Sequence, residues 1–129
     1  MTKRTVPKPT AGELEILRIL WEHGPSTVRE VHDALRREKD VGYTTVLKLM
    51  QIMTDKGTLR RNEQQRAHVY EACQPAEKTK RALVGDVLQR VFQGSASQLM
   101  MHALEGRRTS RAELEELRHL LDKYEKGLP

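Results

Sequence analysis

Residues 41–70 constrain the fold of this chain most strongly, because they predict a helix, a strand, a basic turn and a second strand in direct succession. The helix should begin near Gly42 and Tyr43 and end at Gly57, where glycine can adopt the left-handed conformation that closes a helix. Strands are expected over residues 58–63 and 67–72, joined by a turn. This order of elements is typical of a winged helix-turn-helix.

Two helices are expected before this segment, each opened by a capping box, in which a threonine and a glutamate satisfy each other's backbone N–H groups. Thr10-x-x-Glu13 opens a helix over residues 11–23, which the Gly-Pro pair that follows should stop. Thr27-x-x-Glu30 opens a short second helix that should reach about residue 37, after an extended piece at residues 26–27. The fold class is therefore mainly α with a small β-wing, and the winged domain is expected over residues 10–74.

The start of the third helix and the hairpin after it carry the side chains expected to contact duplex DNA. Two threonines offer hydroxyl and methyl groups to base edges and phosphates, a tyrosine can donate to a phosphate, and a lysine extends the same face by one turn. Three arginines surround the strand turn, where a basic hairpin commonly follows the DNA backbone. The predicted DNA-binding residues are Tyr43, Thr44, Thr45, Lys48, Arg60, Arg61 and Arg66.

The charge of the chain favours a polyanionic partner only mildly. The 129 residues include 23 Lys and Arg against 18 Asp and Glu, which gives a formal charge of +5. Residues 1–74 hold 13 basic and 10 acidic side chains and residues 75–129 hold 10 and 8, so neither part is a polybasic arm. DNA affinity must therefore come from where the charges lie, with some help from a mobile tail over residues 1–9 that carries Lys3, Arg4 and Lys8.

Residues 75–129 change in character and form a predicted helical dimerisation domain. Helical segments are expected over residues 77–93, 95–105 and 110–126, the last opened by a third capping box, Ser110-x-x-Glu113. About fifty residues are too few to bury the apolar stripes of these helices alone, so we expect a homodimer. The predicted dimerisation residues are Leu83, Val84, Val87, Leu88, Val91, Phe92, Leu99, Met100, Leu104, Leu114, Leu117 and Leu121.

The runs TAGELEILRILWEHGPSTVREVHDAL, YTTVLKLMQIMTDKGTLRR and RAHVYEA together resemble the BlaI/MecI/CopY family of bacterial transcriptional repressors. The resemblance extends from about Thr10 to residue 125 and is weaker in the helical tail. It implies a dimer that occupies a palindromic DNA operator, with the third helix in the major groove and the C-terminal helices intertwined with those of the partner. It also assigns recognition contacts to Tyr43, Thr44, Thr45 and Lys48, and a wing contact to Arg66.

Members of this family release DNA in different ways. The copper-responsive branch has a cysteine-rich C-terminal metal motif, which this chain lacks because its end reads DKYEKGLP. The β-lactam-responsive branch is cleaved in the dimerisation helices after a membrane sensor protease detects the drug. Aligned with that branch, His102 and Ala103 occupy the cleaved position in place of an asparagine and a phenylalanine. The resemblance thus implies a candidate cleavage region at His102 and Ala103, and leaves direct sensing of a small ligand open as an alternative.

Several other kinds of protein are disfavoured by the sequence. One cysteine, Cys73, excludes an internal disulfide and a multi-thiolate zinc site, and the histidines lack metal-binding spacing. Neither a glycine-rich phosphate loop nor a nucleophile with a neighbouring base is apparent, so we expect no enzyme activity and no cofactor. The absence of a long apolar run predicts a cytoplasmic protein without membrane insertion. A winged helix that docks another protein is the alternative from a different functional class.

Overall fold

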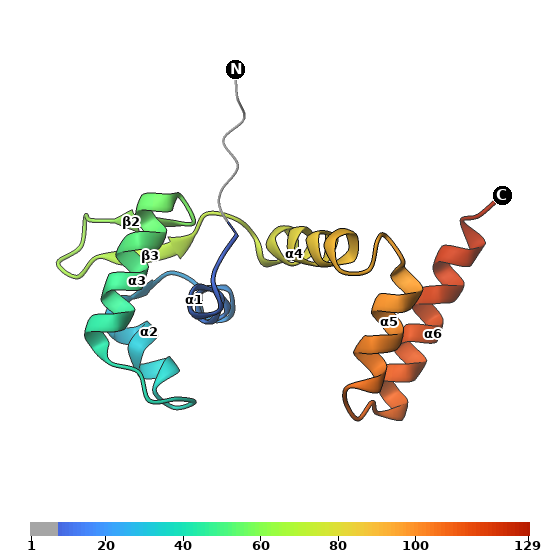
Figure 1. Cartoon of the computed structure of the whole chain (residues 1–129). Helices are drawn as coiled ribbons and strands as arrows, with labels where there is room; N and C mark the ends of the chain where they lie inside the picture. Colours follow the sequence, from blue (N-terminus) through green and yellow to red (C-terminus); the bar gives the residue numbers. More distant parts are fainter. Residues whose placement is uncertain (1–7) are drawn as a thin grey trace, which may run out of the picture. The chain divides into compact units, whose positions relative to one another are not determined.

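Thr10 and Thr27 each open a helix in the way that their spacing predicts. The hydroxyl of each threonine accepts the N–H of the glutamate three residues later, and the glutamate carboxylate accepts the N–H of the threonine at 2.9 Å. Helix α1 spans Ala11–His23 and helix α2 spans Val28–Leu35 in the computed structural model, which describes residues 8–129 (Figure 1). The tail predicted over residues 1–9, with Lys3 and Arg4, therefore lies outside the described residues apart from Lys8 and Pro9.

Helix α2 ends two residues earlier than the sequence predicts. The backbone N–H groups of Glu38 and Lys39 both donate to the Leu35 carbonyl, so the chain turns away there. Arg18 and Glu15 on α1 hold this turn through ion pairs with Glu38 and Lys39 respectively. The chain therefore leaves α2 at Leu35, and side chains of α1 pair with the turn that follows.

Helix α3 spans Tyr43–Lys56, and Gly57 closes it with a φ of +87° that favours glycine. Strand β2, Leu59–Asn62, and strand β3, Val69–Ala72, follow as an antiparallel hairpin. Both are shorter than predicted, because the Asn62 side chain accepts the N–H of Gln64 and starts the turn early.

A third strand, β1 at Ser26–Thr27, completes the sheet in the order β1-β3-β2. Ser26 pairs with Tyr70 and Thr27 with Val69, so the extended piece between α1 and α2 is fastened to the wing. The mainly helical fold with a small β-wing is confirmed, and the wing contains one more strand than the hairpin that the sequence indicates.

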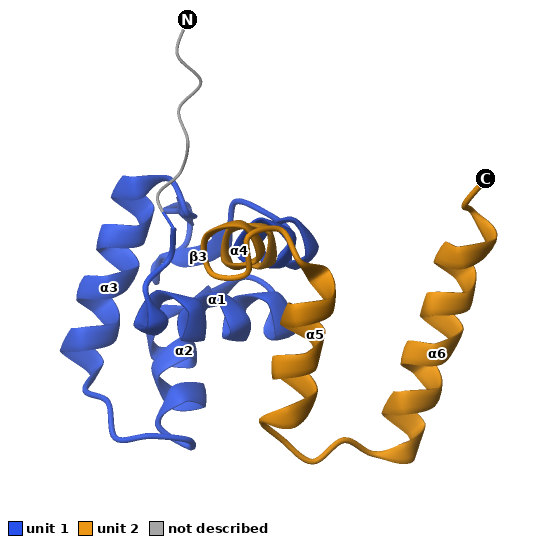
Figure 2. Ribbon diagram, turned by 45° about the vertical axis from the view of Figure 1, so that its right-hand side comes forward, with its two compact units in different colours: residues 1–83 blue, residues 84–129 orange. Residues whose placement is uncertain are grey.

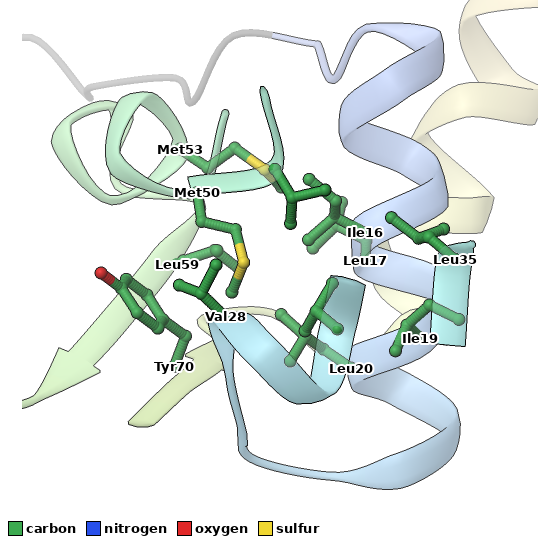
Figure 3. Packing of buried hydrophobic residues seen from close by; sticks show 12 residues of the cluster. Ile16, Leu17, Ile19, Leu20, Val28, Leu35, Met50, Met53, Leu59 and Tyr70 are labelled. Carbon is green, nitrogen blue, oxygen red and sulfur yellow. The ribbon is translucent and has the colours of Figure 1, made fainter. Parts of the chain in front are cut away.

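One apolar core joins the three helices and the sheet. Residues from α1, α2, α3, β2 and β3 point into it, and Figure 3 shows Leu59 and Tyr70 from the strands on one side of the cluster and Ile16 and Leu17 from α1 on the other. Helices α1, α2 and α3 each supply several members, so their apolar faces are buried against one another. The buried apolar residues are Ile16, Leu17, Ile19, Leu20, Val28, Val31, Leu35, Val46, Met50, Met53, Leu59 and Tyr70.

Helices α4, α5 and α6 span Ala76–Arg90, Ala96–Glu105 and Arg111–Lys126. The chain divides into two compact units, residues 1–83 and 84–129, so the division falls within α4 (Figure 2). The boundary expected from the sequence, after residue 74, lies just before this helix. No helix in the described part of the chain is both long enough and apolar enough to cross a bilayer.

The capping box predicted at Ser110 and Glu113 is only half formed. Ser110 accepts the N–H of Glu113 and caps α6, but the Glu113 carboxylate lies 3.2 Å from a guanidinium nitrogen of Arg107. A charged donor attracts the carboxylate more strongly than the Ser110 N–H does. The loop before α6 therefore closes through an ion pair in place of the reciprocal hydrogen bond.

Helices α4, α5 and α6 contain no buried residue, although all of their residues are described. Of the twelve predicted dimerisation residues, Leu83, Leu88, Phe92, Leu99 and Leu117 are half-buried. The other seven are exposed: Val84, Val87, Val91, Met100, Leu104, Leu114 and Leu121. A single copy of unit 2 thus leaves its apolar faces open to water.

Candidate nucleic-acid interface

Helix α3 presents one face to the core and the other to solvent. Val46, Met50 and Met53 are fully buried, and this anchors the helix along its length. Thr44, Thr45 and Lys48 are exposed on the opposite side, as the sequence predicts. The buried residues therefore fix the position of α3, and the exposed side chains remain accessible to a DNA groove.

Tyr43 begins α3 and is held partly by His32 from α2. The two rings lie edge to face with centroids 5.8 Å apart, and 44% of Tyr43 stays exposed. The Nε2 atom of the same histidine lies 2.8 Å from the Val41 carbonyl, to which it donates when protonated at that nitrogen. His32 thus fixes both the tyrosine and the loop that leads into α3.

The N-terminus of α3 differs from those of α1, α2, α5 and α6. Those four helices begin with a serine or threonine whose hydroxyl accepts a first-turn N–H, whereas Gly42 supplies no side chain to α3. The first N–H groups of α3 remain available to an acceptor outside the protein, and a helix N-terminus favours negative charge.

The end of α3 is fixed to the start of α1 by an ion pair. Lys56, in the last turn of α3, lies 2.9 Å from the carboxylate of Glu13, whose side chain is only 3% exposed. Burial by itself raises the pKa of Glu13, but the Thr10 N–H and the Lys56 ammonium together lower it below its usual value. Glu13 is therefore an ionised side chain that caps α1 and anchors α3 at once.

The three arginines of the hairpin differ in whether they bind a carboxylate. Arg60 and Arg61 are paired with carboxylates: Arg60 Nε lies 2.8 Å from Glu71 Oε1, and Arg61 binds Glu63. Tyr70 and Glu63 both raise the pKa of Arg61, so its guanidinium stays charged. Arg66 forms no ion pair with any residue between 8 and 129.

Arg66 and Tyr43, far apart in the sequence, line one shallow depression of about 330 Å³. Thr27, Arg29 and His68 line it as well, so it brings together the starts of α2 and α3 and the end of the hairpin turn. Neither Arg29 nor His68 is among the predicted DNA-binding residues. Arg29 could have been suspected, because it is a basic residue in the first turn of α2. Its closeness to Arg66, which is 37 positions away in the sequence, could not be predicted.

The remaining predicted site residues lie elsewhere. Arg60 and Arg61 line a separate open depression with Glu63 and Glu71. His102 and Ala103 are exposed within the continuous helix α5, and the His102 ring lies 5.5 Å from that of Phe92. The described residues contain no cluster of three histidine, cysteine or acidic side chains that could hold a metal ion.

The chain was compared with known proteins. Residues 9–123 match the sequence model of the family described as penicillinase repressor. The transcriptional regulator BlaI of Mycobacterium tuberculosis (strain ATCC 25618 / H37Rv) is 32% identical over 120 residues, which are 90% of this chain and 86% of that protein. The penicillinase repressor of Bacillus licheniformis is 22% identical over 121 residues, 94% of each chain.

A solved structure supports the same fold. The solution structure of the DNA-binding domain of the repressor BlaI superposes with a TM-score of 0.51 at 22% identity, and covers 57% of this chain and 90% of that domain. This likeness confirms the winged helix-turn-helix. The family match over residues 9–123, together with the relative that is 32% identical, shows that this protein belongs to the penicillinase repressor family.

Proposed function

We propose that this protein is a transcriptional repressor that binds a palindromic DNA operator as a homodimer. The observation that carries the proposal is the first turn of α3, where exposed Tyr43, Thr44 and Thr45 are rigidly held beside the depression that contains Arg66. Membership of a family of repressors supports the same role. The proposed activity is binding, with no chemical step and no cofactor, and the proposed location is the cytoplasm.

The two parts of the interface are proposed to do different work. Thr44, Thr45 and Lys48 project from the exposed face of α3, where they can reach base edges in the major groove. Arg66 and Arg29, with the first N–H groups of α3, suit phosphate oxygens, because cationic and backbone donors position a protein on DNA without reading sequence.

A second copy of the chain is the proposed cover for the apolar faces of unit 2. Seven of the predicted dimerisation residues are exposed in one copy, which a stable soluble protein would not leave in water. Twofold symmetry would then place two α3 helices in successive major grooves, about 34–36 Å apart. The operator should accordingly be an inverted repeat.

Release of DNA is proposed to follow proteolysis near His102 and Ala103, by a membrane sensor protease. Both residues are exposed, but they lie inside α5, which runs unbroken over Ala96–Glu105. Proteases bind extended chains, so α5 must unwind locally before cleavage. Cutting there would divide unit 2 and remove the contacts that join two copies.

Mobility-shift assays at two salt concentrations, with the promoter upstream of the protein's own gene and with random duplex DNA, test the proposal. We expect tighter binding to the promoter. Arg66→Ala should weaken binding to both DNAs and reduce the salt slope by about 0.9, the loss of one phosphate contact. Thr45→Ala should reduce the difference in binding free energy between promoter and random DNA by about 1–3 kcal/mol, the value of one base contact.

Two outcomes would contradict the proposal. Equal binding of promoter and random DNA by the unmodified protein would argue against a sequence-specific repressor and for a protein-docking module. Equal losses on both DNAs for Thr45→Ala would remove Thr45 from the recognition surface.

A further inference from the structure

The β2–β3 hairpin carries its own carboxylates directly beside two of its arginines. Arg60 and Glu71 are opposite each other in the register, and their side chains meet at 2.8 Å. Arg61 is bound by Glu63, two positions along the chain. Residues 59–72 contain three arginines and two glutamates, so the net charge of the hairpin is only 3 − 2 = +1.

A hairpin that only had to attract DNA would not need these carboxylates. The strand pair is closed by backbone hydrogen bonds, and exposed ion pairs add little to stability. The side chains of Glu63 and Glu71 are 56% and 44% exposed, so they can be replaced as partners of the arginines by phosphate groups. The ion pairs are therefore present in the free protein, and a phosphate can easily replace the carboxylate in each of them.

We propose that Glu63 and Glu71 limit the affinity of the hairpin for DNA, because they hold Arg61 and Arg60 in internal ion pairs that must break before either arginine can contact a phosphate. This inference rests on the proposed function. On an operator, the base contacts of α3 fix the hairpin against the backbone and drive the exchange of carboxylate for phosphate. On random DNA those base contacts are missing, so the arginines keep their internal partners and the hairpin contributes Arg66 alone.

Removal of the two carboxylates should affect DNA binding to different extents. Arg61 lies opposite Tyr70 in the strand register, Tyr70 is only 2% exposed, and the Arg61 side chain is 33% exposed against 63% for Arg60. Loss of Glu63 therefore leaves Arg61 still largely covered by the protein, whereas loss of Glu71 leaves Arg60 without its partner. Glu71→Gln should accordingly have the larger effect of the two.

Fluorescence anisotropy with the full-length protein and a random 30-base-pair duplex, over a series of salt concentrations, measures the effect. Glu71→Gln should bind random DNA about three- to tenfold more tightly, with a salt slope steeper by about 0.9, because one more phosphate is contacted. Affinity for the operator should rise by at least the same factor, because the operator complex of the unmodified protein spends free energy on breaking the Arg60–Glu71 ion pair. Glu63→Gln should shift random-DNA binding in the same direction by a smaller factor.

A matched control separates this effect from the change in net charge. Glu115→Gln also removes one negative charge and also releases an arginine, Arg118, but does so in α6. It should leave the affinity for random DNA within about twofold of the unmodified protein. Thermal unfolding of each variant, and Glu71→Thr as a second strand-compatible substitution, guard against a change in folding.

A double-mutant cycle decides the mechanism. If Glu71 acts by restraining Arg60, Arg60→Gln combined with Glu71→Gln should bind random DNA no more tightly than Arg60→Gln alone. A gain that persists without Arg60, an equal gain in Glu115→Gln, or no gain in Glu71→Gln would overturn the inference. Each of these results concerns random DNA only, so it is distinct from a failure of the proposed function, which would appear as unmodified protein that does not prefer the promoter.

Discussion

At the scale of single residues, Glu13 shows how one side chain can perform several structural tasks. Its carboxylate accepts the Thr10 N–H at the start of α1 and meets Lys56 at the end of α3, both at 2.9 Å. A buried carboxylate is tolerated only when it is hydrogen-bonded and paired, and both conditions hold here. The recognition helix is thus fastened to α1 by a charge that must stay ionised.

The pKa of Glu13 lies below 4.5 in the folded protein and near 4.5 in the unfolded chain, so its ionised form stabilises the fold. That contribution is complete well above pH 4.5 and is lost as the pH falls through the folded pKa. Glu13→Gln should therefore lose about 1–3 kcal/mol of the free energy of unfolding at pH 7, and progressively less as the pH falls through the folded pKa of Glu13.

Urea denaturation at several pH values measures this difference. Glu22→Gln, which removes an exposed carboxylate from the same helix, serves as the control and should follow the unmodified protein within about 0.5 kcal/mol. If the curves of free energy against pH for Glu13→Gln and the unmodified protein ran parallel, the stabilising role of the ionised carboxylate would be refuted.

At the scale of elements, α3 lacks a side-chain cap at its N-terminus, which is the end that we propose contacts DNA. Gly42 precedes the helix with a φ of −79°, and a side chain built there would meet nothing within 4 Å. Serine, asparagine and aspartate are preferred at such positions because they satisfy an N–H of the first turn. A glycine leaves that N–H, and the space in front of it, open.

We expect Gly42→Ser and Gly42→Asp each to raise the free energy of unfolding by a few tenths of a kcal/mol, because each supplies the missing cap. Their effects on DNA should diverge. Gly42→Asp places a negative charge where a phosphate is expected and should weaken binding to promoter and random DNA about tenfold, whereas Gly42→Ser should weaken it much less.

Chemical denaturation and anisotropy on the same two variants provide the comparison. Equal DNA affinity for the serine and aspartate variants would mean that no phosphate approaches the start of α3.

At the scale of the whole molecule, the two units bury their apolar residues to very different extents. Unit 1 surrounds its own core, while the helices of unit 2 expose Leu121 at 66% and Tyr124 at 69%. A dimer would cover these side chains and double the number of contacts with DNA. Dimerisation and operator binding should therefore be lost together.

Leu121→Asp is expected to convert the protein to a monomer in sedimentation velocity while unit 1 keeps its thermal transition. Loss of the second half-site should weaken operator binding by at least about 100-fold, since linked sites commonly gain that factor. Leu128→Asp makes the same substitution at a residue 71% exposed beyond α6 and should stay dimeric. A Leu121→Asp variant that still sediments as a dimer would place the interface elsewhere.

Elements that depend on residues close together in the chain can be predicted from the sequence. The capping boxes at Thr10 and Thr27, the closure of α3 at Gly57 and the apolar stripes are all set by residues a few positions apart, so their physical causes can be read along the chain. The winged fold and the exposed face of α3 followed from these local signals.

Contacts between residues far apart in the sequence become known only from the folded structure. There β1 pairs with β3, Glu13 binds Lys56 over 43 positions, and Arg107 binds the Glu113 carboxylate that was expected to cap Ser110. Arg60 and Arg61 bind carboxylates, whereas Arg66 has no ion pair among residues 8–129. Charges and strand edges interact with whatever the fold brings within a few ångströms, and one-dimensional spacing does not specify that neighbour.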